Sequence, residues 1–232
     1  MSVLLECKQL VKRYGYTQAL TGINLNLEKG KIIGLLGPNG SGKTTLIKLT
    51  AGLLRPTSGE ITINGEKVGQ KTKSVVSYLP DRNYIPKHMK IEKILYLFSD
   101  FYKDFDKNRA MEMLKNLGLD PSNRIKSLSK GMLEKLQLIL VMSRQAELYL
   151  LDEPIAGVDP AARDYILNTI ITNYNPSASI IISTHLISDI ENILDDIIMI
   201  KNGSIVMQGD ADSIRDEHQK SIDEIFREVF RC

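Results

Sequence analysis

The sequence predicts an α/β fold in which helices cover both faces of a mostly parallel sheet. Apolar, strand-sized runs alternate with helical segments in the second half of the chain, the pattern typical of parallel sheets. A glycine-rich loop at 37–45 joins a predicted strand to a predicted helix. From about 88 to 147 the apolar residues follow a helical period, which indicates a helical insertion into the sheet.

The first 87 residues are mainly strands, because short apolar runs are separated by Gly, Pro and Asn. One helix is expected directly after the glycine-rich loop. The strands predicted in this part are LLECKQL (4–10), GINLNLE (22–28), KIIGLLG (31–37), GEITING (59–65) and VVSYLP (75–80).

The insertion begins where apolar side chains recur at spacings of three and four residues. The first such set is Ile91, Ile94, Leu95, Phe98, Phe101 and Tyr102. The segments 108–119 and 130–143 also have the character of helices. Beyond the insertion, strands are predicted at 147–153, 179–184, 195–200 and 204–209, with helices between them.

The last segment, 221–232, carries its apolar side chains on one helical face. These side chains are Ile222, Ile225, Phe226, Val229 and Phe230. The pattern favours a helix packed on the protein's own core, and contact with a subunit or partner is the alternative. We expect no further regulatory domain after residue 232.

Composition excludes several classes of function. The formal net charge of +2 over 232 residues gives no basis for nucleic-acid binding or a polybasic membrane surface. The N-terminus lacks the apolar core of a signal peptide, and no stretch reaches the roughly 18–20 apolar residues of a membrane span. Cys7 and Cys232 have no metal-binding spacing, as expected of free thiols in a reducing compartment. We expect a cytoplasmic protein that reaches a membrane only through a partner.

Residues 37–44 have the pattern Gly-x-x-x-x-Gly-Lys-Thr. Glycines permit backbone conformations that a Cβ would block, so successive N–H groups can surround an anion. The following helix adds its free N–H groups and the positive end of its dipole. Lys43 is placed to reach the β- and γ-phosphates of a nucleotide, and the Thr44 hydroxyl is placed to bind Mg²⁺. The alternative is a chance match at a strand–turn–helix corner.

The loop therefore predicts a nucleotide site. The residues assigned to ATP binding are Gly37, Asn39, Gly40, Ser41, Gly42, Lys43, Thr44 and Thr45, and Lys43 is also assigned to catalysis.

A second group of residues supports the prediction of a nucleotide site. The predicted strand 147–153 ends in two adjacent carboxylates, Asp152 and Glu153. Ligands of parallel sheets bind at the carboxyl ends of the strands, where the glycine-rich loop is also expected. Asp152 is placed to hold Mg²⁺, and Glu153 is placed to polarise the water that attacks the γ-phosphate. A strand end capped by solvated acids is the alternative interpretation.

A longer stretch of sequence indicates which family of nucleotide-binding proteins the chain resembles. Residues 127–160, SLSKGMLEKLQLILVMSRQAELYLLDEPIAGVDP, resemble the corresponding region of the ATP-binding cassette (ABC) ATPases, and the resemblance covers nearly the whole chain. The segments 11–30 and 179–191 are also similar to that family. The resemblance implies a single ABC ATPase domain over 1–232, with a P-loop NTPase core. Its core and antiparallel β part would come from 1–87 and 148–232, and its helical subdomain from about 88–147.

The same resemblance implies further site residues. Tyr14 matches the aromatic residue that stacks on adenine, although Tyr16 is close enough to compete. His185 matches the histidine that helps to position the attacking water. Ser129 and Gly131 would face the γ-phosphate of ATP bound to a second subunit, with a plain helix N-cap as the alternative. Asp159 falls in the family's D-loop.

Two positions depart from the family pattern. The signature, commonly LSGGQ, is Leu-Ser-Lys-Gly-Met here, so Lys130 and Met132 are unusual. Asp81 stands where the family usually has glutamine. We expect Asp81 to offer an oxygen to Mg²⁺, so that three carboxylates converge near the phosphates. Asp81 capping a turn and facing solvent is the alternative.

The resemblance implies an ATP-hydrolysing, energy-coupling subunit of a membrane transporter, with ATP and Mg²⁺ as cofactors. Its partners would be a separate transmembrane permease and a second ABC ATPase subunit, identical or related. The stretch FSDFYKDFD and the short signature favour an exporter of drugs, peptides or lipid-like molecules over an importer. The alternative is an ABC ATPase without a transport role, such as an assembly or cell-division scaffold. The protein would lie on the inner face of the cell membrane.

Overall fold

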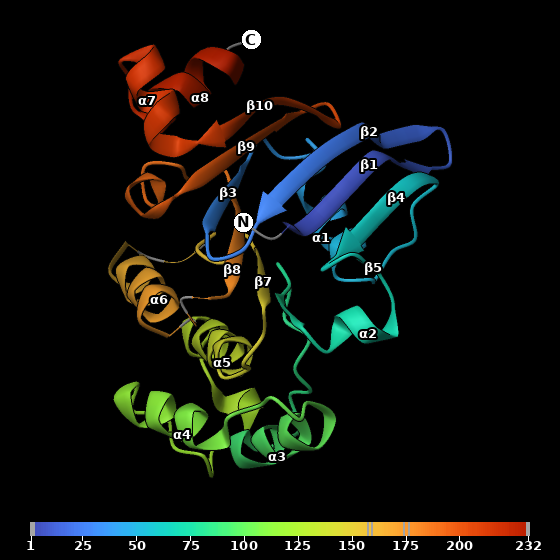
Figure 1. Ribbon diagram of the computed structural model, residues 1–232. Coiled ribbons are helices and arrows are strands. Elements are labelled where there is room, and N and C mark those ends of the chain that lie inside the picture. The colour runs from blue at the N-terminus through green and yellow to red at the C-terminus, as the bar shows by residue number, and fades with distance from the viewer. Residues whose placement is uncertain (1–2, 157, 159, 174, 176, 231–232) are drawn as a thin grey trace.

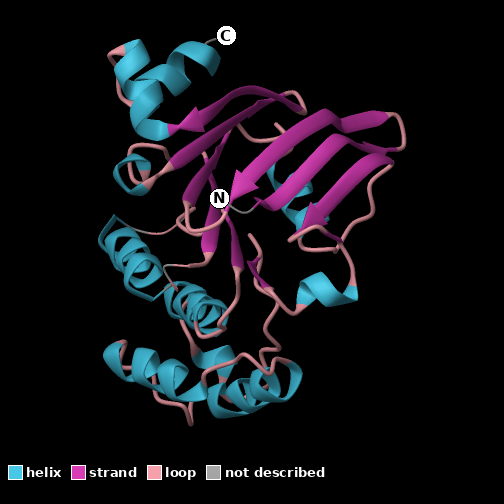
Figure 2. Ribbon diagram, in the orientation of Figure 1, coloured by secondary structure: helices cyan, strands magenta, loops and turns pink. Residues whose placement is uncertain are grey.

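Two β-sheets form the framework of the protein (Figures 1 and 2). The computed structural model describes residues 3–156, 158, 160–173, 175 and 177–230. The smaller sheet is antiparallel and has the strand order β2-β1-β4-β5. Its strands are β1 (Val3–Tyr14), β2 (Thr17–Glu28), β4 (Ser58–Ile63) and β5 (Glu66–Lys67). The predicted antiparallel N-terminal part is confirmed.

The larger sheet has the strand order β10-β9-β3-β8-β7-β6. Neighbouring strands from β9 to β6 run parallel, and β10 is antiparallel to β9. Its strands are β3 (Ile32–Leu36), β6 (Val76–Leu79), β7 (Leu148–Asp152), β8 (Ser179–Thr184), β9 (Asp196–Lys201) and β10 (Ser204–Asp210). Since β3, β7 and β8 run in the same direction, the loops after them meet at one edge of the sheet.

Both faces of the parallel strands are buried, which explains why they are continuous apolar runs. All five residues of β7 are buried. Leu148 and Leu150 join the core that packs α1 and the smaller sheet. Tyr149 and Leu151 join the core that packs the helical insertion and the C-terminal helices. Successive side chains of a strand point to opposite faces, so one short strand contributes to both cores.

The helices that contribute buried apolar side chains divide between these two cores, and α2 contributes none. The helices are α1 (Lys43–Thr50), α2 (Gln70–Lys73), α3 (Ile91–Phe101), α4 (Lys107–Asn116), α5 (Lys130–Met142), α6 (Pro160–Asn173), α7 (Ala211–His218) and α8 (Ile222–Phe230), with 3₁₀ turns at Ile125–Ser127 and Glu191–Ile193. Helices α3, α4 and α5 lie between β6 and β7 in the chain. In Figure 1 α3 and α4 lie at the end of the molecule opposite α7 and α8.

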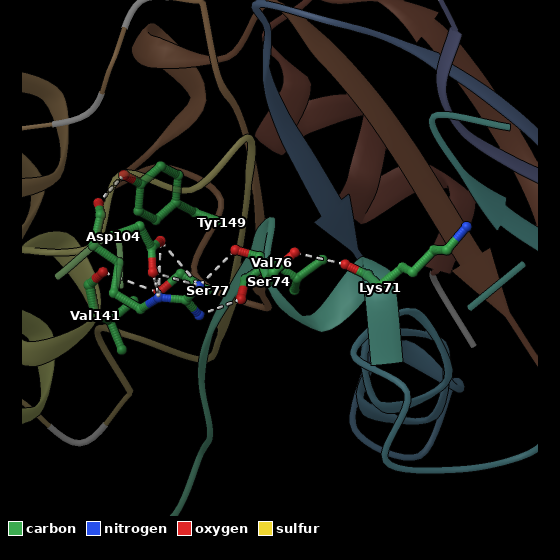
Figure 3. Close-up of polar contacts among 8 residues, drawn as sticks. Lys71, Ser74, Val76, Ser77, Asp104, Val141 and Tyr149 are labelled. Atoms are coloured by element: carbon green, nitrogen blue, oxygen red, sulfur yellow. Dashed lines mark hydrogen bonds and ion pairs between the residues drawn. The ribbon is translucent and has the colours of Figure 1, made fainter. Parts of the chain in front are cut away.

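A buried arginine fastens the loop after α3 to the larger sheet (Figure 3). Arg144 is 3% exposed, and its guanidinium contacts the Asp104 carboxylate at N···O distances of 3.0–3.2 Å. It also donates to the backbone carbonyls of Ser74 and Val76, at 2.9 and 2.5 Å. The Tyr149 hydroxyl donates to the Arg144 carbonyl at 2.5 Å. A buried guanidinium needs such partners, and here they come from two segments of the chain, residues 74–76 and the loop that contains Asp104.

The C-terminal helix packs on the protein's own core, as its apolar face predicts. Ile222 and Ile225 are 0% and 2% exposed and belong to the core that contains the helical insertion. The Lys201 ammonium of β9 donates to the Val229 carbonyl at 2.8 Å. Cys232 lies outside the described residues, whereas Cys7 is buried in the other core. Across the described ranges we find no helix that is both long and apolar enough to cross a bilayer.

Candidate functional site

The loop between β3 and α1 has a shape that only glycine permits at two positions. Gly42 has φ 114°, and a Cβ there would lie 2.8 Å from the Ala19 carbonyl oxygen. A Cβ on Gly37 would lie 2.5 Å from the Ile200 carbonyl oxygen. The loop thus turns sharply between two neighbouring segments and delivers the first turn of α1 to the edge of the sheet.

Lys43, the first residue of α1, is folded back over the loop. Its side chain is 5% exposed, and its ammonium donates to the carbonyls of Gly37 and Pro38 at 2.7 and 3.3 Å. It also lies 3.3 Å from Oε1 of Glu153. A buried ammonium requires acceptors, and the loop carbonyls and a carboxylate supply them. The cation is therefore held at the mouth of the loop, within reach of an anion bound there.

Asp152, the last residue of β7, lies at the centre of a hydroxyl network. Its Oδ1 accepts from the Ser183 hydroxyl at 2.7 Å and from the Thr44 hydroxyl at 3.1 Å. Burial raises the pKa of Asp152, the two hydroxyls oppose that rise, and the charge of Asp81 adds to it. The network links α1, β7 and β8, so it fixes the position of the carboxylate relative to the loop.

Glu153 is held in a strained backbone conformation. Its φ of 53° lies in the left-handed region, which non-glycine residues seldom adopt. Its backbone N–H donates to the carbonyl and hydroxyl oxygens of Ser183, both at 3.1 Å. Its Oε2 lies 3.0 Å from Nδ1 of His185, while Oε1 faces Lys43. Sequence reasoning assigned Lys43, Glu153 and His185 to catalysis, and the three side chains form one chain of contacts.

The donor set at this edge fits a hard cation. Oδ2 of Asp152 and the Ser41 hydroxyl are buried, and neither has a hydrogen-bond partner among the described residues. A carboxylate oxygen and a neighbouring threonine hydroxyl are ligands that Mg²⁺ takes, with water and phosphate oxygens completing its shell. Asp152 and Thr44 would hold the metal, and the Ser41 hydroxyl lies in the loop that would receive the phosphates.

Asp81 differs from the expectation of three converging carboxylates. In the described part of the chain, no three His, Cys, Asp or Glu side chains lie close enough together to hold a metal ion. Oδ2 of Asp81 instead lies 3.8 Å from Nε of Arg82, the next residue, whose cation competes for the carboxylate. Asp81 and Glu153 nevertheless line the same cavity of about 150 Å³. Whether Asp81 binds the metal stays a prediction.

The other predicted binding residues lie on the surface. Tyr14 is 47% exposed at the end of β1, with the Lys12 ammonium 5.2 Å from its ring centroid. Tyr16 is fully exposed, so both tyrosines remain available for stacking on a base. Asn39 and Gly40 are exposed at the tip of the loop, whereas Thr45 lies in the first turn of α1 and is partly buried.

Ser129 and Gly131 begin helix α5. The Ser129 hydroxyl accepts from the Met132 N–H at 3.2 Å, which is the N-cap interaction. A Cβ on Gly131 would meet nothing within 4 Å, so the start of α5 is open to a ligand. In the described residues no hydrogen bond or ion pair joins Ser129 to the glycine-rich loop of the same chain. Asp159 lies outside the described residues.

Similarity to known proteins decides the family. A family model described as ABC transporter matches residues 20–156. The chain belongs to the ABC transporter family. The ABC transporter ATP-binding protein YtrB of Bacillus subtilis (strain 168) is 30% identical over 220 residues, 94% of this chain and 75% of YtrB. The linearmycin resistance ATP-binding protein LnrL of the same strain is 30% identical over 214 residues, 89% of this chain and 69% of LnrL.

A solved structure agrees with these relatives. It is an ATP-binding subunit of an ABC transporter, with a TM-score of 0.89 and 29% identity, and the match covers 98% of this chain and all of that one. The ABC ATPase fold is thereby confirmed. ABC ATPases bind ATP, and ATP hydrolysis is the general activity of the family. This chain is related to the ATP-binding subunits of ABC transporters.

Sequence reasoning missed one residue of this ABC ATPase site. Ser183 of β8 contacts both Asp152 and the backbone of Glu153. The signal was present but weak, because Ser183 follows three isoleucines near the end of a predicted strand. Parallel pairing sets Ser183 beside Asp152. The local sequence does not predict that Ser183 lies beside Asp152, because this depends on the order of the strands in the sheet.

Proposed function

We propose that this chain is the ATP-hydrolysing subunit that couples ATP turnover to movement of a substrate through a separate membrane permease. The contact chain from Lys43 through Glu153 to His185 carries the proposal. It supports a hydrolytic site with a cation for phosphates, a carboxylate base and an imidazole. A module that only senses nucleotides would have no need of the strained carboxylate.

Each residue has a defined role in the proposed mechanism. When bound, ATP and Mg²⁺ supply the γ-phosphate and the charge that stabilises it. Lys43 exchanges the carbonyls of Gly37 and Pro38 for phosphate oxygens. Asp152 and Thr44 would hold the metal. Glu153 accepts a proton from the attacking water at a carboxylate oxygen, and His185 fixes the other oxygen.

We further propose that the substrate is exported and that it is a drug, peptide or lipid-like molecule. The relative LnrL is named for linearmycin resistance, which supports a drug exporter. The stretch FSDFYKDFD and the short signature, both in the helical insertion, also favour export. A location on the inner face of the membrane follows from the permease partner rather than from the chain itself.

The proposed assembly contains two ATPase subunits. Ser129 and Gly131 have no phosphate loop against them within their own described chain, so we infer that a second subunit supplies it. The helical insertion and the segment after Asp81 are proposed to contact the permease, because they border the cavity that contains Glu153. ATP binding would then close two subunits onto each other, and hydrolysis would release them.

Purification from native membranes tests the proposal. A tagged chain is captured after detergent extraction, and its bound proteins and its ATPase rate are measured. We expect a multi-span membrane protein in stoichiometric amount and ATPase activity that is lost in Lys43→Ala, because the ammonium that pairs with phosphate is gone. Recovery of an active ATPase with soluble partners alone would contradict a transport role and favour an assembly scaffold.

A further inference from the structure

Ser183, near the end of β8, is a buried residue that has no part in the mechanism proposed above. It is 0% exposed, and parallel pairing sets it directly beside Asp152. Leu150 and Ile181, which lie two residues earlier in the two strands, belong to the core that packs α1. Side chains two residues apart in a strand point to the same face of the sheet. Ser183 and Asp152 therefore face the helix that carries Thr44.

The Ser183 hydroxyl bridges the two acidic residues at the end of β7. It donates its single proton to Oδ1 of Asp152 at 2.7 Å. Its lone pairs remain free to accept a hydrogen bond, and the backbone N–H of Glu153 donates one at 3.1 Å. The same N–H also donates to the Ser183 carbonyl at 3.1 Å. One side chain thus contacts the proposed metal ligand and the backbone of the proposed base.

The contact with Asp152 determines which of its oxygens is left for a metal. Oδ1 accepts from the hydroxyls of Ser183 and Thr44, at 2.7 and 3.1 Å. Oδ2 is buried and has no hydrogen-bond partner among the described residues. Hydrogen bonds of this kind orient the carboxylates that bind metal ions. Because Thr44 would itself bind the metal, Ser183 is the hydroxyl of this pair that acts only on the orientation of Asp152.

The contact with Glu153 supports an unusual backbone conformation. The φ of 53° is costly for a residue with a Cβ, and such a conformation persists only where the surroundings hold it. Both hydrogen bonds of the Glu153 N–H end on Ser183. With the backbone held, Oε1 lies 3.3 Å from the Lys43 ammonium and Oε2 lies 3.0 Å from Nδ1 of His185. The serine therefore helps to aim the carboxylate that would accept the proton of water.

We infer that Ser183 is a positioning residue for ATP hydrolysis, which holds the metal-binding carboxylate and the water-activating carboxylate in one geometry. It acts through Asp152 and Glu153 rather than on the nucleotide. Because one hydroxyl holds both residues, a change in the position of Asp152 is passed to the backbone of Glu153. Ser183 can act in this way only if the two acids have the roles given above, so its role rests on the proposed function.

Ser179, at the other end of β8, provides a matched control. It is also 0% exposed, and its hydroxyl accepts from the Gly30 N–H at 2.9 Å and donates to the Glu28 carbonyl at 3.3 Å. Ser179 is the first residue of the strand, so it lies at the edge of the sheet opposite the glycine-rich loop. Ser179→Ala therefore measures the effect of losing a buried, bridging hydroxyl from this strand without a change at the proposed ATP site.

Nucleotide binding is the first test, because it needs no turnover. Binding of a fluorescent ATP analogue to the purified full chain is measured in EDTA and across a Mg²⁺ titration. We expect Ser183→Ala to keep the affinity of the wild type in EDTA, since the glycine-rich loop and Lys43 are intact. The Mg²⁺ concentration that gives half of the metal-dependent gain in affinity should rise by about tenfold or more, as when other partners of metal ligands are removed. Ser179→Ala should not change that concentration.

Steady-state kinetics is the second test. In Ser183→Ala we expect kcat to fall by about 10–100-fold, because the base and the metal ligand are no longer held together. The KM for ATP at saturating Mg²⁺ should stay within about twofold of the wild type, because the groups that bind phosphate are unchanged. Melting temperatures are measured in parallel. Both alanine variants should melt below the wild type, since each loses a buried hydrogen bond, but Ser179→Ala should keep the kinetic constants of the wild type.

The results for Ser183 and for the proposed function can be told apart. A wild-type kcat in Ser183→Ala, or a lower kcat without a changed Mg²⁺ requirement, overturns the positioning role. An equal fall of kcat in Ser179→Ala also overturns it, because any lost hydroxyl of β8 would then have the same effect. Glu153→Gln is measured beside them. If it abolishes hydrolysis while Ser183→Ala does not, the proposed function stands without Ser183, whereas a wild-type rate in Glu153→Gln overturns the proposed function itself.

Discussion

Glu153 and Asp152 are adjacent in the chain, yet their surroundings differ. Asp152 is 1% exposed and surrounded by hydroxyls, whereas the Glu153 side chain is 14% exposed and lies between two basic groups, Lys43 and His185. The left-handed backbone at Glu153 turns its side chain out of the alternation that the strand would impose. One short strand end therefore presents one carboxylate suited to a metal and another suited to a water molecule.

Asp152→Asn should raise the stability of the nucleotide-free protein. Folding raises the pKa of Asp152 above its ordinary 3.8, so keeping it ionised costs folding free energy at neutral pH. A neutral amide avoids that charge cost, and we expect a higher melting temperature than that of the wild type at pH 7. The gain should shrink as pH falls through the raised pKa, because the wild-type carboxyl then becomes protonated. Thermal denaturation between pH 4 and 7 measures both effects.

Asp104→Asn is the opposite control for that measurement. It weakens the buried pair with Arg144 and should lower the melting temperature. An Asp152→Asn protein that melts below the wild type at pH 7 would show that the buried carboxylate is not a source of strain.

Asp81→Gln should reduce the dependence of the protein on Mg²⁺. The charge of Asp81 acts on Asp152, and a negative charge near bound phosphates is tolerated best when a cation intervenes. We expect nucleotide binding and ATPase rate to need less Mg²⁺ in the variant, measured across a Mg²⁺ titration with and without the membrane partner. Asp100→Asn, on the exposed side of α3, is the control. Identical titration curves for Asp81→Gln and wild type in both settings would assign Asp81 to solvent.

At the scale of elements, the local apolar pattern was sufficient to predict the strands that are buried on both faces. The predicted strands 31–37, 147–153 and 179–184 agree with β3, β7 and β8 because buried parallel strands are continuous apolar runs. The antiparallel strands β1 and β2 are longer than the predicted 4–10 and 22–28. Sequence reasoning did not find β5 and α2, since Glu66–Lys67 and Gln70–Lys73 are short and polar. Arg144 escaped notice for another reason: its partners Asp104 and Val76 are distant in the chain, and only folding brings them together.

Removal of α8 by truncation before Ser221 should destabilise the protein. Ile222 and Ile225 are buried in the core, and each fully buried aliphatic side chain contributes about 1.5–3 kcal/mol. We expect a lower melting temperature and an unchanged elution volume on size exclusion. Val206→Ala, at an exposed position of β10, is the control and should have little effect. An unchanged melting temperature with a new oligomeric state would assign α8 to a partner contact.

At the scale of the whole molecule, the proposed ATP site is divided between two places. The glycine-rich loop and the carboxylates gather at the edge of the larger sheet, while Ser129 caps α5 at the helical insertion. A groove of about 670 Å³ between the larger sheet and the insertion is lined by Pro80, Asp81 and Asn83, which also line the cavity that contains Glu153. This arrangement is expected of a protein in which the glycine-rich loop of one subunit and the start of α5 of another form a complete ATP site.

Glu153→Gln should trap that assembly. The amide keeps the shape of the side chain but cannot accept a proton from water, so hydrolysis should fall by about 10²–10⁴-fold while ATP stays bound. Among the described residues, no phosphate loop of the same chain lies against the open start of α5, so ATP retained by one copy should recruit a second. We expect a dimer on size exclusion with ATP and Mg²⁺ and a monomer without them. Lys43→Ala combined with Glu153→Gln should stay monomeric, since phosphate binding is lost. A Glu153→Gln chain that retains one equivalent of ATP yet elutes as a monomer would contradict the homodimer and require a related second subunit.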